Sequence, residues 1–302
     1  MFKTIGLWFA MNAAIMVVIT ISFYVIERVF GIPLSTHTWG YMWMFISAAI
    51  IGFAGSFLSL AISKWMAKRA YKMTFLTEEN EWTLSEKERI VYSTVVSLAR
   101  ENSIKTPEIG IYNDDEPNAF ATGPSKNNSL VAVSTGLLDG MNKDAIEWVV
   151  AHEMAHILNW DMVTMTLLQW VLNTFVVFIS NILTNIIDNM LDEKMWFLAR
   201  IWVVIFLQLL LWILASLIAN KFSRYREFKA DAGSAKYVGK DKMIAWLQAL
   251  KNMQEKMHNL DDSKMAAMQI ATKKRTWFMS LFSTHPDLDD RIKALEDLQI
   301  QL

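Results

Sequence analysis

Two histidines and one glutamate in a short segment are the residues best placed to do chemistry. They stand in the sequence His152-Glu153-Met154-Ala155-His156. On a helix, residues four apart point the same way, so the two imidazoles can bind one metal ion. Neutral imidazole nitrogens suit zinc, and Glu153 would lie beside a zinc-bound water as general base. The pattern predicts one Zn²⁺ per chain and metal-assisted hydrolysis.

The residues around this segment favour a metal site over a polar stripe on a core helix. Apolar residues flank it at Ile146, Trp148, Val150 and Ile157, so the segment has the composition of an apolar helix. A polar stripe there would leave buried polar groups in need of partners, which is costly. The five-residue pattern alone arises by chance in roughly one chain of this size per hundred, so the apolar context carries the argument.

A catalytic zinc site has three protein ligands and one open position, so a third ligand must come from elsewhere in the chain. Glu227 is the strongest candidate, and Asp231, four residues later, would share its side of a helix. One of the two could bind metal while the other holds a ligand histidine by its remaining N–H. The alternative is an ordinary surface helix with Arg–Glu pairs, and spacing alone leaves both open. Among the remaining histidines, only His285 stays a candidate ligand.

Four apolar stretches are long enough to cross a bilayer, which needs about 20 residues. They cover residues 5–26, 41–62, 162–187 and 196–219. The first has no small-residue cleavage site after it, which favours a retained anchor over a signal peptide. The last two contain polar residues, so a hairpin that is partly buried in protein or lies shallow in the membrane is the alternative.

The flanking charges predict the orientation of the chain. Basic residues follow the second and fourth stretches: Lys64, Lys68, Arg69, Lys72, Lys221, Arg224, Arg226 and Lys229. The loop between the third and fourth stretches is mainly acidic. Because Lys and Arg accumulate on the cytoplasmic side, both termini and most of the polar sequence should be cytoplasmic.

These features predict four parts. Residues 1–63 form a transmembrane hairpin, and 64–160 form the first half of a cytoplasmic domain that contains the two histidines. Residues 161–220 form a second hairpin, and 221–302 form the second half of the domain with the third ligand.

Two helices are expected in the first half of the polar domain. The sequence Ser85-Glu86-Lys87-Glu88 is a capping box, which should begin a helix that ends at about Asn102. The segment that contains both histidines should be a helix over residues 142–160.

Short strands are expected between these helices. Residues 108–112 and 129–134 have strand-like apolar patterns, and 118–121 would form a third, exposed strand. The intervening residues 123–128 are rich in turn formers and are expected to form a turn.

The composition excludes several classes of protein. The chain of 302 residues is 53% hydrophobic and has a formal net charge of −1, so it lacks the basic surface of a nucleic-acid-binding protein. It has no cysteine, which excludes disulfides, thiolate zinc sites and a cysteine nucleophile.

The chain resembles the M48 family of membrane metallopeptidases. The resemblance rests on the two-histidine pattern, the adjoining apolar hairpin, Pro117–Gly123, Ser223–Asp231 and Ser283–Pro286, in the same order along the chain. It implies an α+β, mainly helical fold, in which a zincin-like domain with a small sheet is joined to four transmembrane helices. It also implies that His152, His156 and Glu227 bind zinc, that Glu153 is base and acid, and that Asp231 supports a ligand.

The resemblance further implies how a substrate would bind. Asn118, Ala119 and Phe120 look like the edge strand that pairs with an extended peptide. His285 would match a histidine that stabilises the oxyanion. The alternative for His285 is a loop residue before the last helix, with Tyr225 or Arg224 in its place.

The implied function is an endopeptidase that cleaves misfolded membrane proteins under stress, in the bacterial inner membrane. The rival function is a membrane chaperone or adaptor that holds such proteins without cutting them, with some of the 19 methionines as an adaptable surface.

Overall fold

The structure is a computed structural model that describes residues 38–190, 197–248, 251 and 286–298. The described chain divides into two compact units. One contains the residues up to Ser59 together with Thr166–Ser216, and the other contains Leu60–Met165 and the residues from Leu217 onward. The predicted first apolar stretch, residues 5–26, lies outside the described residues.

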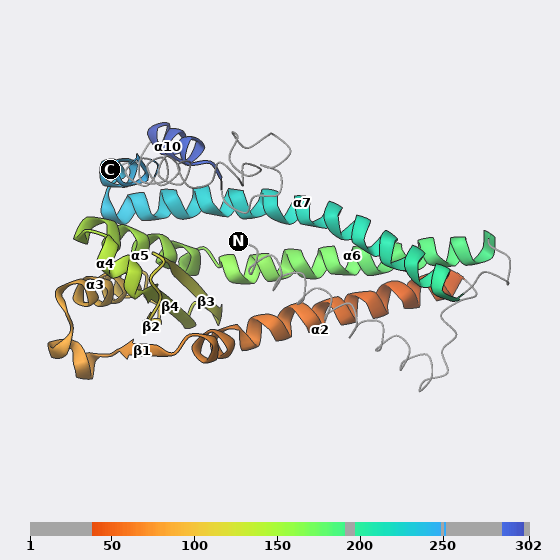
Figure 1. Ribbon diagram of the computed structural model, residues 1–302, viewed down its shortest axis with the longest axis horizontal. Coiled ribbons are helices and arrows are strands. Elements are labelled where there is room, and N and C mark those ends of the chain that lie inside the picture. Colours follow the sequence, from red (N-terminus) through yellow and green to blue (C-terminus); the bar gives the residue numbers. More distant parts are fainter. Residues whose placement is uncertain (1–37, 191–196, 249–250, 252–285, 299–302) are drawn as a thin grey trace, which may run out of the picture. The chain divides into compact units, whose positions relative to one another are not determined.

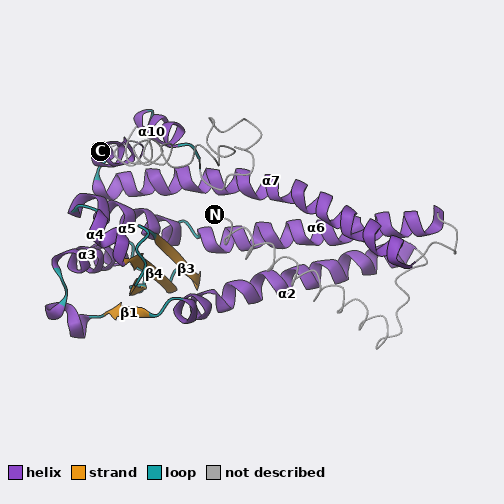
Figure 2. Ribbon diagram, viewed as in Figure 1, coloured by secondary structure: helices purple, strands orange, loops and turns teal. Residues whose placement is uncertain are grey.

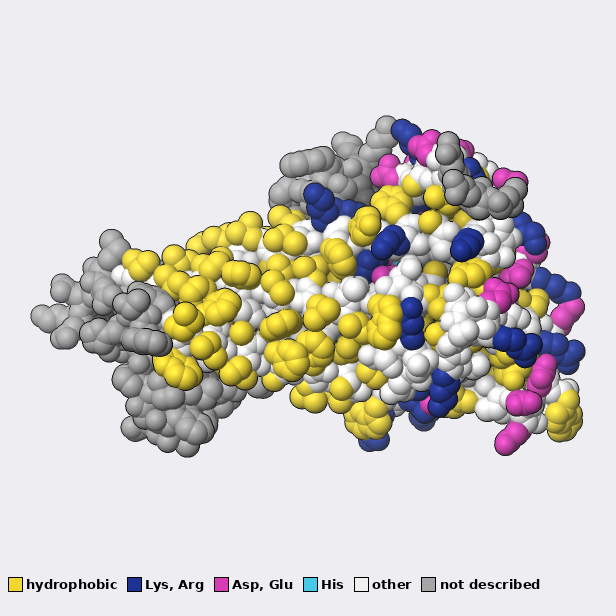
Figure 3. All heavy atoms as spheres, turned by 180° about the vertical axis from the view of Figure 1, so that it is seen from behind, with side chains coloured by type: hydrophobic (Ala, Val, Ile, Leu, Met, Phe, Trp, Pro, Cys, Tyr) yellow, Lys and Arg dark blue, Asp and Glu magenta, His cyan; other side chains and the backbone are white. Residues whose placement is uncertain are grey.

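Long apolar helices make up the first unit and continue into the second. They are α2 (Thr38–Ala70), α6 (Asp161–Met190) and α7 (Phe197–Val238). Three segments of them, Met42–Ala70, Asp161–Thr184 and Ile205–Val238, are long and apolar enough to cross a membrane. On the face seen in Figure 3, hydrophobic side chains make up much of the surface of these helices.

Small residues let α2 and α6 approach closely in the first unit. Ala48 is fully buried, and a Cβ on Gly52 would lie 2.9 Å from the Thr174 hydroxyl oxygen. The Trp170 indole N–H donates a hydrogen bond of 2.9 Å to the backbone oxygen of Ala49. In lipid there is little hydrophobic driving force for helices to associate, because the lipid tails are as apolar as the side chains. Small residues therefore favour association by letting the helices pack closely.

A four-stranded mixed sheet lies in the second unit, and helices make up most of the rest of the described chain (Figure 2). The strands are β1 (Met73–Leu76), β2 (Glu108–Tyr112), β3 (Ala119–Ser125) and β4 (Asn128–Ser134). Their order is β1-β2-β4-β3; β2 and β4 are parallel and the other two pairs are antiparallel. β3 is therefore an edge strand of the sheet.

The helices α3 (Glu86–Glu101) and α5 (Lys143–Leu158) share one core with the sheet (Figure 1). The predicted capping box is confirmed, because the Ser85 hydroxyl accepts from the Glu88 N–H and the Glu88 carboxylate accepts from the Ser85 N–H. Further elements of this unit are η1 (Glu78–Thr83), α4 (Thr135–Gly140), a helix over the described residues 240–248, and α10 (Leu288–Glu296).

The sequence interpretation was wrong in two places in the sheet. β1 was not expected, because four residues are too few to show a pattern and the strand forms by pairing with β2. Residues 123–125 were expected in a turn but belong to β3. The strand continues because the pairing with β4 shifts register between Thr122 and Ser125, where Gly123 has a φ of 140°.

Replacing Gly123 with alanine should lower stability by about 2–5 kcal/mol, from the strained φ and the overlap together. A Cβ there would lie 2.3 Å from the backbone oxygen of Asn128. Thermal unfolding of the purified protein measures the effect. Gly140→Ala is the matched control, because the nearest atom, on Pro117, is 4.0 Å away. Equal melting temperatures for the two variants would contradict the prediction.

Candidate metal centre and active site

Helix α5 presents the two histidines because its opposite side is held in the core. Asn142 caps its start by accepting a hydrogen bond of 2.9 Å from the Ala145 N–H. Ile146, Val150, Met154 and Ile157 are fully buried along the helix. This spacing fixes the rotation of α5, so that His152 and His156 project away from that apolar side.

Helix α7 brings the carboxylates to the same place. Glu227 and Asp231 lie one turn apart on α7, and both are buried. A small residue permits the close approach of the two helices, since a Cβ on Gly233 would lie 3.1 Å from the Ala155 Cβ. All these residues belong to the second unit.

Three side chains bring atoms that could bind a metal ion close together. His152, His156 and Glu227 each offer one such atom, and these atoms lie within 4.8 Å of one another. The Nε2 atoms of His152 and His156 lie 3.6 and 3.5 Å from the two carboxylate oxygens of Glu227. The structure thus brings together the three residues that the resemblance implied as ligands.

The second nitrogen of each imidazole faces an aspartate. His152 Nδ1 lies 3.0 Å from Asp231 Oδ1, and His156 Nδ1 lies 2.6 Å from Asp161 Oδ2. The His156 contact is a hydrogen bond in which Nδ1 donates, because a carboxylate only accepts. The His152 contact lies at ion-pair distance, and in both rings Nε2 faces Glu227 and remains available to a metal. Asp231 takes the supporting position that the resemblance implied, and Asp161 adds a second one.

The electrostatics of the site follow from burial and these contacts. Burial, the largest single effect, lowers the pKa of His156, but hydrogen bonds to Asp161 and Glu227 outweigh it and raise the pKa to about 10. The pKa of His152 is raised as well. Burial lowers it, but the interactions with Asp231 and Glu227 outweigh the effect of burial. A metal would therefore displace protons from both rings.

Glu153 lies between the histidines and the edge strand. Burial raises the pKa of its carboxyl group, and the nearby His156 and His152 lower it to a lesser extent. The Ala121 backbone N–H donates a hydrogen bond to this carboxylate. A carboxylate with a raised pKa, next to two imidazoles, is suited to accept and release a proton.

The edge strand presents backbone groups to which a further strand can add, apart from the Ala121 N–H, which donates to Glu153. Asn118 pairs with Ser134: its backbone oxygen accepts from the Ser134 N–H, and its N–H donates to the Ser134 hydroxyl, both at 2.9 Å. Because alternate residues of an antiparallel strand face the partner, Ala119 and Ala121 direct their backbone groups to the open edge. The Phe120 ring packs instead against Tyr71 and Tyr112, with centroids 5.4 and 5.8 Å away.

Of the three candidates for stabilising the oxyanion, the structure describes Tyr225 and Arg224, both on α7. His285 lies outside the described residues. Tyr225 is exposed on α7, with the Lys229 amine 5.5 Å from its ring centroid.

Comparison with known proteins decides the family. Residues 85–299 match peptidase family M48. The chain belongs to peptidase family M48. The protease HtpX homologue of Bacillus licheniformis is 48% identical over 254 residues, which cover 84% of each chain. The protease HtpX of Alkalilimnicola ehrlichii is 44% identical over 304 residues, which cover 98% of each chain.

The fold of this M48 chain is also that of a protein of known structure. The crystal structure of S. mikatae Ste24p matches with a TM-score of 0.64 and 17% identity, over 97% of this chain. The chain spans 65% of the length of Ste24p, and the likeness shows the fold alone. The predicted family and fold class are confirmed. As an M48 member with membrane-spanning helices, this chain is a membrane protease, and its family implies a metal.

Two residues of this M48 site were missed in the sequence. Asp161 directly precedes the third apolar stretch, where an acidic residue is typical of the first turn of a helix. Arg291 lies on α10 and is 7% exposed; its Nε and Nη2 atoms donate to the two carboxylate oxygens of Asp231 at 2.7 and 2.5 Å. In the sequence, Arg291 looks like any cation of a charged terminal helix, so no local signal marks it.

Proposed function

We propose that this chain is a zinc-dependent endopeptidase. The observation that carries the proposal is the convergence of His152, His156 and Glu227 while an aspartate holds the other nitrogen of each histidine. Glu153 is outside this set of ligands but next to it, which is the place of a general base.

The donor set fits zinc by its chemistry and its dimensions. Two nitrogens and a carboxylate with an open position are typical of catalytic zinc. Tetrahedral zinc with bonds of about 2.1 Å places its ligand atoms about 3.4 Å apart. The two histidine nitrogens lie 3.6 and 3.5 Å from different oxygens of Glu227, close to that value, and all three ligand atoms lie within 4.8 Å of one another.

The mechanism divides the work among the chain's own residues. Zinc, when bound, lowers the pKa of a water molecule to about 7 and polarises the scissile carbonyl. Glu153 accepts the proton of the attacking water and passes it to the leaving amine. The Ala121 N–H orients this carboxylate, and His285 stabilises the oxyanion.

The substrate in this proposal is an extended polypeptide that adds as a strand to the open edge of β3. The Ala119 backbone groups and the Ala121 carbonyl oxygen pair with it, and Asn118 and Phe120 shape the strand that it joins. The resemblance suggests misfolded membrane proteins as substrates and a role in the stress response.

The proposed location is the bacterial inner membrane, with both termini and the active site in the cytoplasm. The basic residues that follow the second and fourth apolar stretches support this orientation. The division of the chain at residues 63, 160 and 220 belongs to the same proposal.

The test combines metal analysis with cleavage. We expect the purified full chain to contain one zinc per chain and to cleave an unfolded protein in a reaction that chelator stops and zinc restores. A protein that binds the unfolded substrate but leaves it intact, with or without zinc, would instead be a chaperone or adaptor.

Replacing Arg291 with alanine should weaken zinc binding by about 10- to 100-fold, as is typical for partners outside the ligand set. The substitution leaves the buried Asp231 carboxylate without its cation, so Asp231 holds His152 less firmly. Competition with a coloured chelator measures the affinity. Lys293→Ala, on the exposed side of the same helix, is the control and should keep the parent affinity. Equal affinities for both variants would contradict the prediction.

A further inference from the structure

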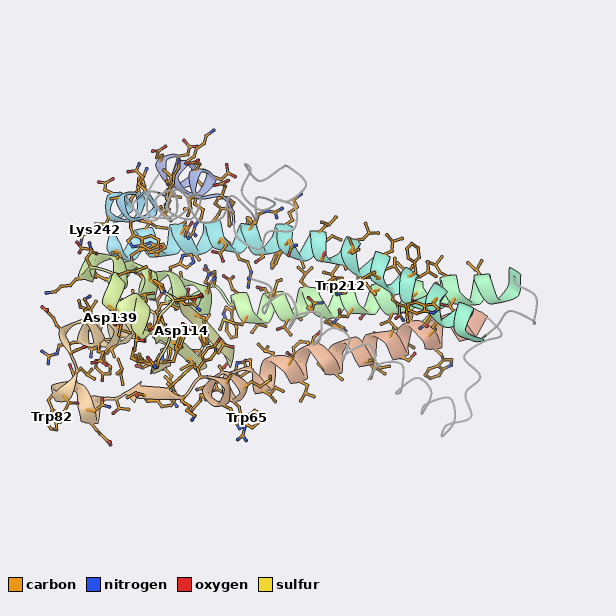
Figure 4. All side chains as sticks on the ribbon, in the orientation of Figure 1. Trp65, Trp82, Asp114, Asp139, Trp212 and Lys242 are labelled. Carbon is orange, nitrogen blue, oxygen red and sulfur yellow. The ribbon has the colours of Figure 1, made fainter. Side chains whose placement is uncertain are left out.

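Three exposed aromatic side chains of the second unit each have a basic side chain over the ring. The pairs are Trp65 with Arg69, Trp160 with Lys126, and Tyr225 with Lys229. The distances from cation to ring centroid are 5.8, 5.1 and 5.5 Å, and the rings are 61, 45 and 56% exposed. Trp65 projects outward from α2 (Figure 4). We call these six residues the aromatic–cation collar.

Each ring lies where an apolar stretch meets polar sequence. Trp65 follows the stretch over residues 41–62, Trp160 directly precedes α6, and Tyr225 follows the stretch that ends at residue 219. Tryptophan and tyrosine accumulate at the membrane–water interface, because one end of each side chain is apolar and the other polar. The sequence positions therefore place the collar at the headgroup layer.

Contacts between neighbouring residues link the three chain segments that carry the pairs. The Lys64 amine donates to the Asn128 side-chain oxygen at 2.9 Å, which connects α2 to the β3–β4 hairpin. Lys126 of that hairpin lies over Trp160. Arg226 donates to the backbone oxygen of Asp161 at 3.0 Å, which connects α7 to the same junction.

The positive charges of the collar are available to an anionic partner. Among the residues that the structure describes, Arg69, Lys126 and Lys229 have no carboxylate within 4.0 Å. The neighbouring Lys64 and Lys68, in contrast, both pair with Glu108. Three unneutralised cations on exposed rings at the membrane boundary complement a negative surface.

We propose that the aromatic–cation collar binds the headgroups of anionic phospholipids in the bilayer that this protein spans. The rings insert at headgroup depth, and the three cations contact lipid phosphates. Each ring and its cation act together, because stacking on the ring holds the cation at the same depth in the bilayer as the ring.

This contact would hold two parts of the site at the membrane surface. Lys126 lies in the turn that follows β3, and Trp160 joins α5 to α6 in a left-handed conformation with a φ of 61°. The next residue, Asp161, holds His156. A substrate segment that leaves the bilayer would then meet the β3 edge directly. This consequence rests on the proposed function, but the lipid preference does not.

The test measures lipid selectivity, which needs no activity. The full chain is reconstituted in phosphatidylcholine vesicles with trace spin-labelled phosphatidylglycerol or phosphatidylcholine, and the relative association of the two labels is determined. The collar variant combines Arg69→Gln, Lys126→Gln and Lys229→Gln. The matched control combines Arg89→Gln, Lys105→Gln and Lys293→Gln, which removes the same charge from exposed positions outside the collar.

We expect the parent protein and the matched control to prefer phosphatidylglycerol. The preference of the collar variant should be at least about threefold lower, and high salt should reduce the preference of the parent. An equal decrease of the phosphatidylglycerol preference in both variants would show that this preference depends only on the net charge of the protein, and would overturn the proposal. A parent protein without the preference, or a collar variant that keeps it, would overturn it as well.

Discussion

Replacing Glu153 with glutamine should reduce turnover by about 10³-fold or more while zinc content stays at one per chain. General acid–base catalysis contributes about 10²- to 10⁴-fold, and here one side chain serves as both base and acid. Glutamine has the same shape and can still accept the Ala121 N–H, but it cannot take a proton from water. Glu153 is not among the three converging ligand residues, so the metal should remain bound.

The measurement compares kcat for an unfolded protein substrate, at saturating zinc, with zinc content from elemental analysis. Glu147→Gln is the matched control, because Glu147 lies on the same helix outside the group of converging side chains. It should keep parental rates. A Glu153→Gln rate within tenfold of the parent rate would show that another group is the base.

Replacing His156 with alanine should abolish both zinc binding and cleavage. The change removes one of three ligands and leaves Asp161 without the imidazole that it holds at 2.6 Å. The loss of zinc affinity should exceed the about 10- to 100-fold that removal of an outer partner causes. Asp161→Asn supplies that comparison, since asparagine can still accept a hydrogen bond from Nδ1.

Chelator competition should therefore rank the parent first, Asp161→Asn second and His156→Ala last. Size-exclusion profiles and far-UV circular dichroism check that each variant is folded. If His156→Ala bound zinc as tightly as Asp161→Asn, His156 would not be a ligand. If it retained cleavage without bound zinc, the metal mechanism itself would be wrong.

Local patterns predicted the elements that depend on neighbouring residues. The capping box at Ser85 and the strand over residues 108–112 are present as expected. The edge strand was predicted only over residues 118–121, and its continuation through Gly123 was not. That continuation depends on a register shift against β4, and β1 depends on pairing with β2, so neither has a local pattern.

The sequence by itself determined that His152 and His156 share one helical side, because the 3.6-residue turn sets the spacing of residues four apart. It also predicted four apolar stretches long enough to span a membrane, because length and composition suffice for that, and three of them lie on long apolar helices in the described part of the chain. Only the tertiary structure buried Glu227 and brought its carboxylate to 3.5 Å from His156 Nε2, and only it placed Asp161 and Arg291. Glu227 is 71 residues from His156 in the chain, and a distance between helices depends on packing, which no local spacing encodes.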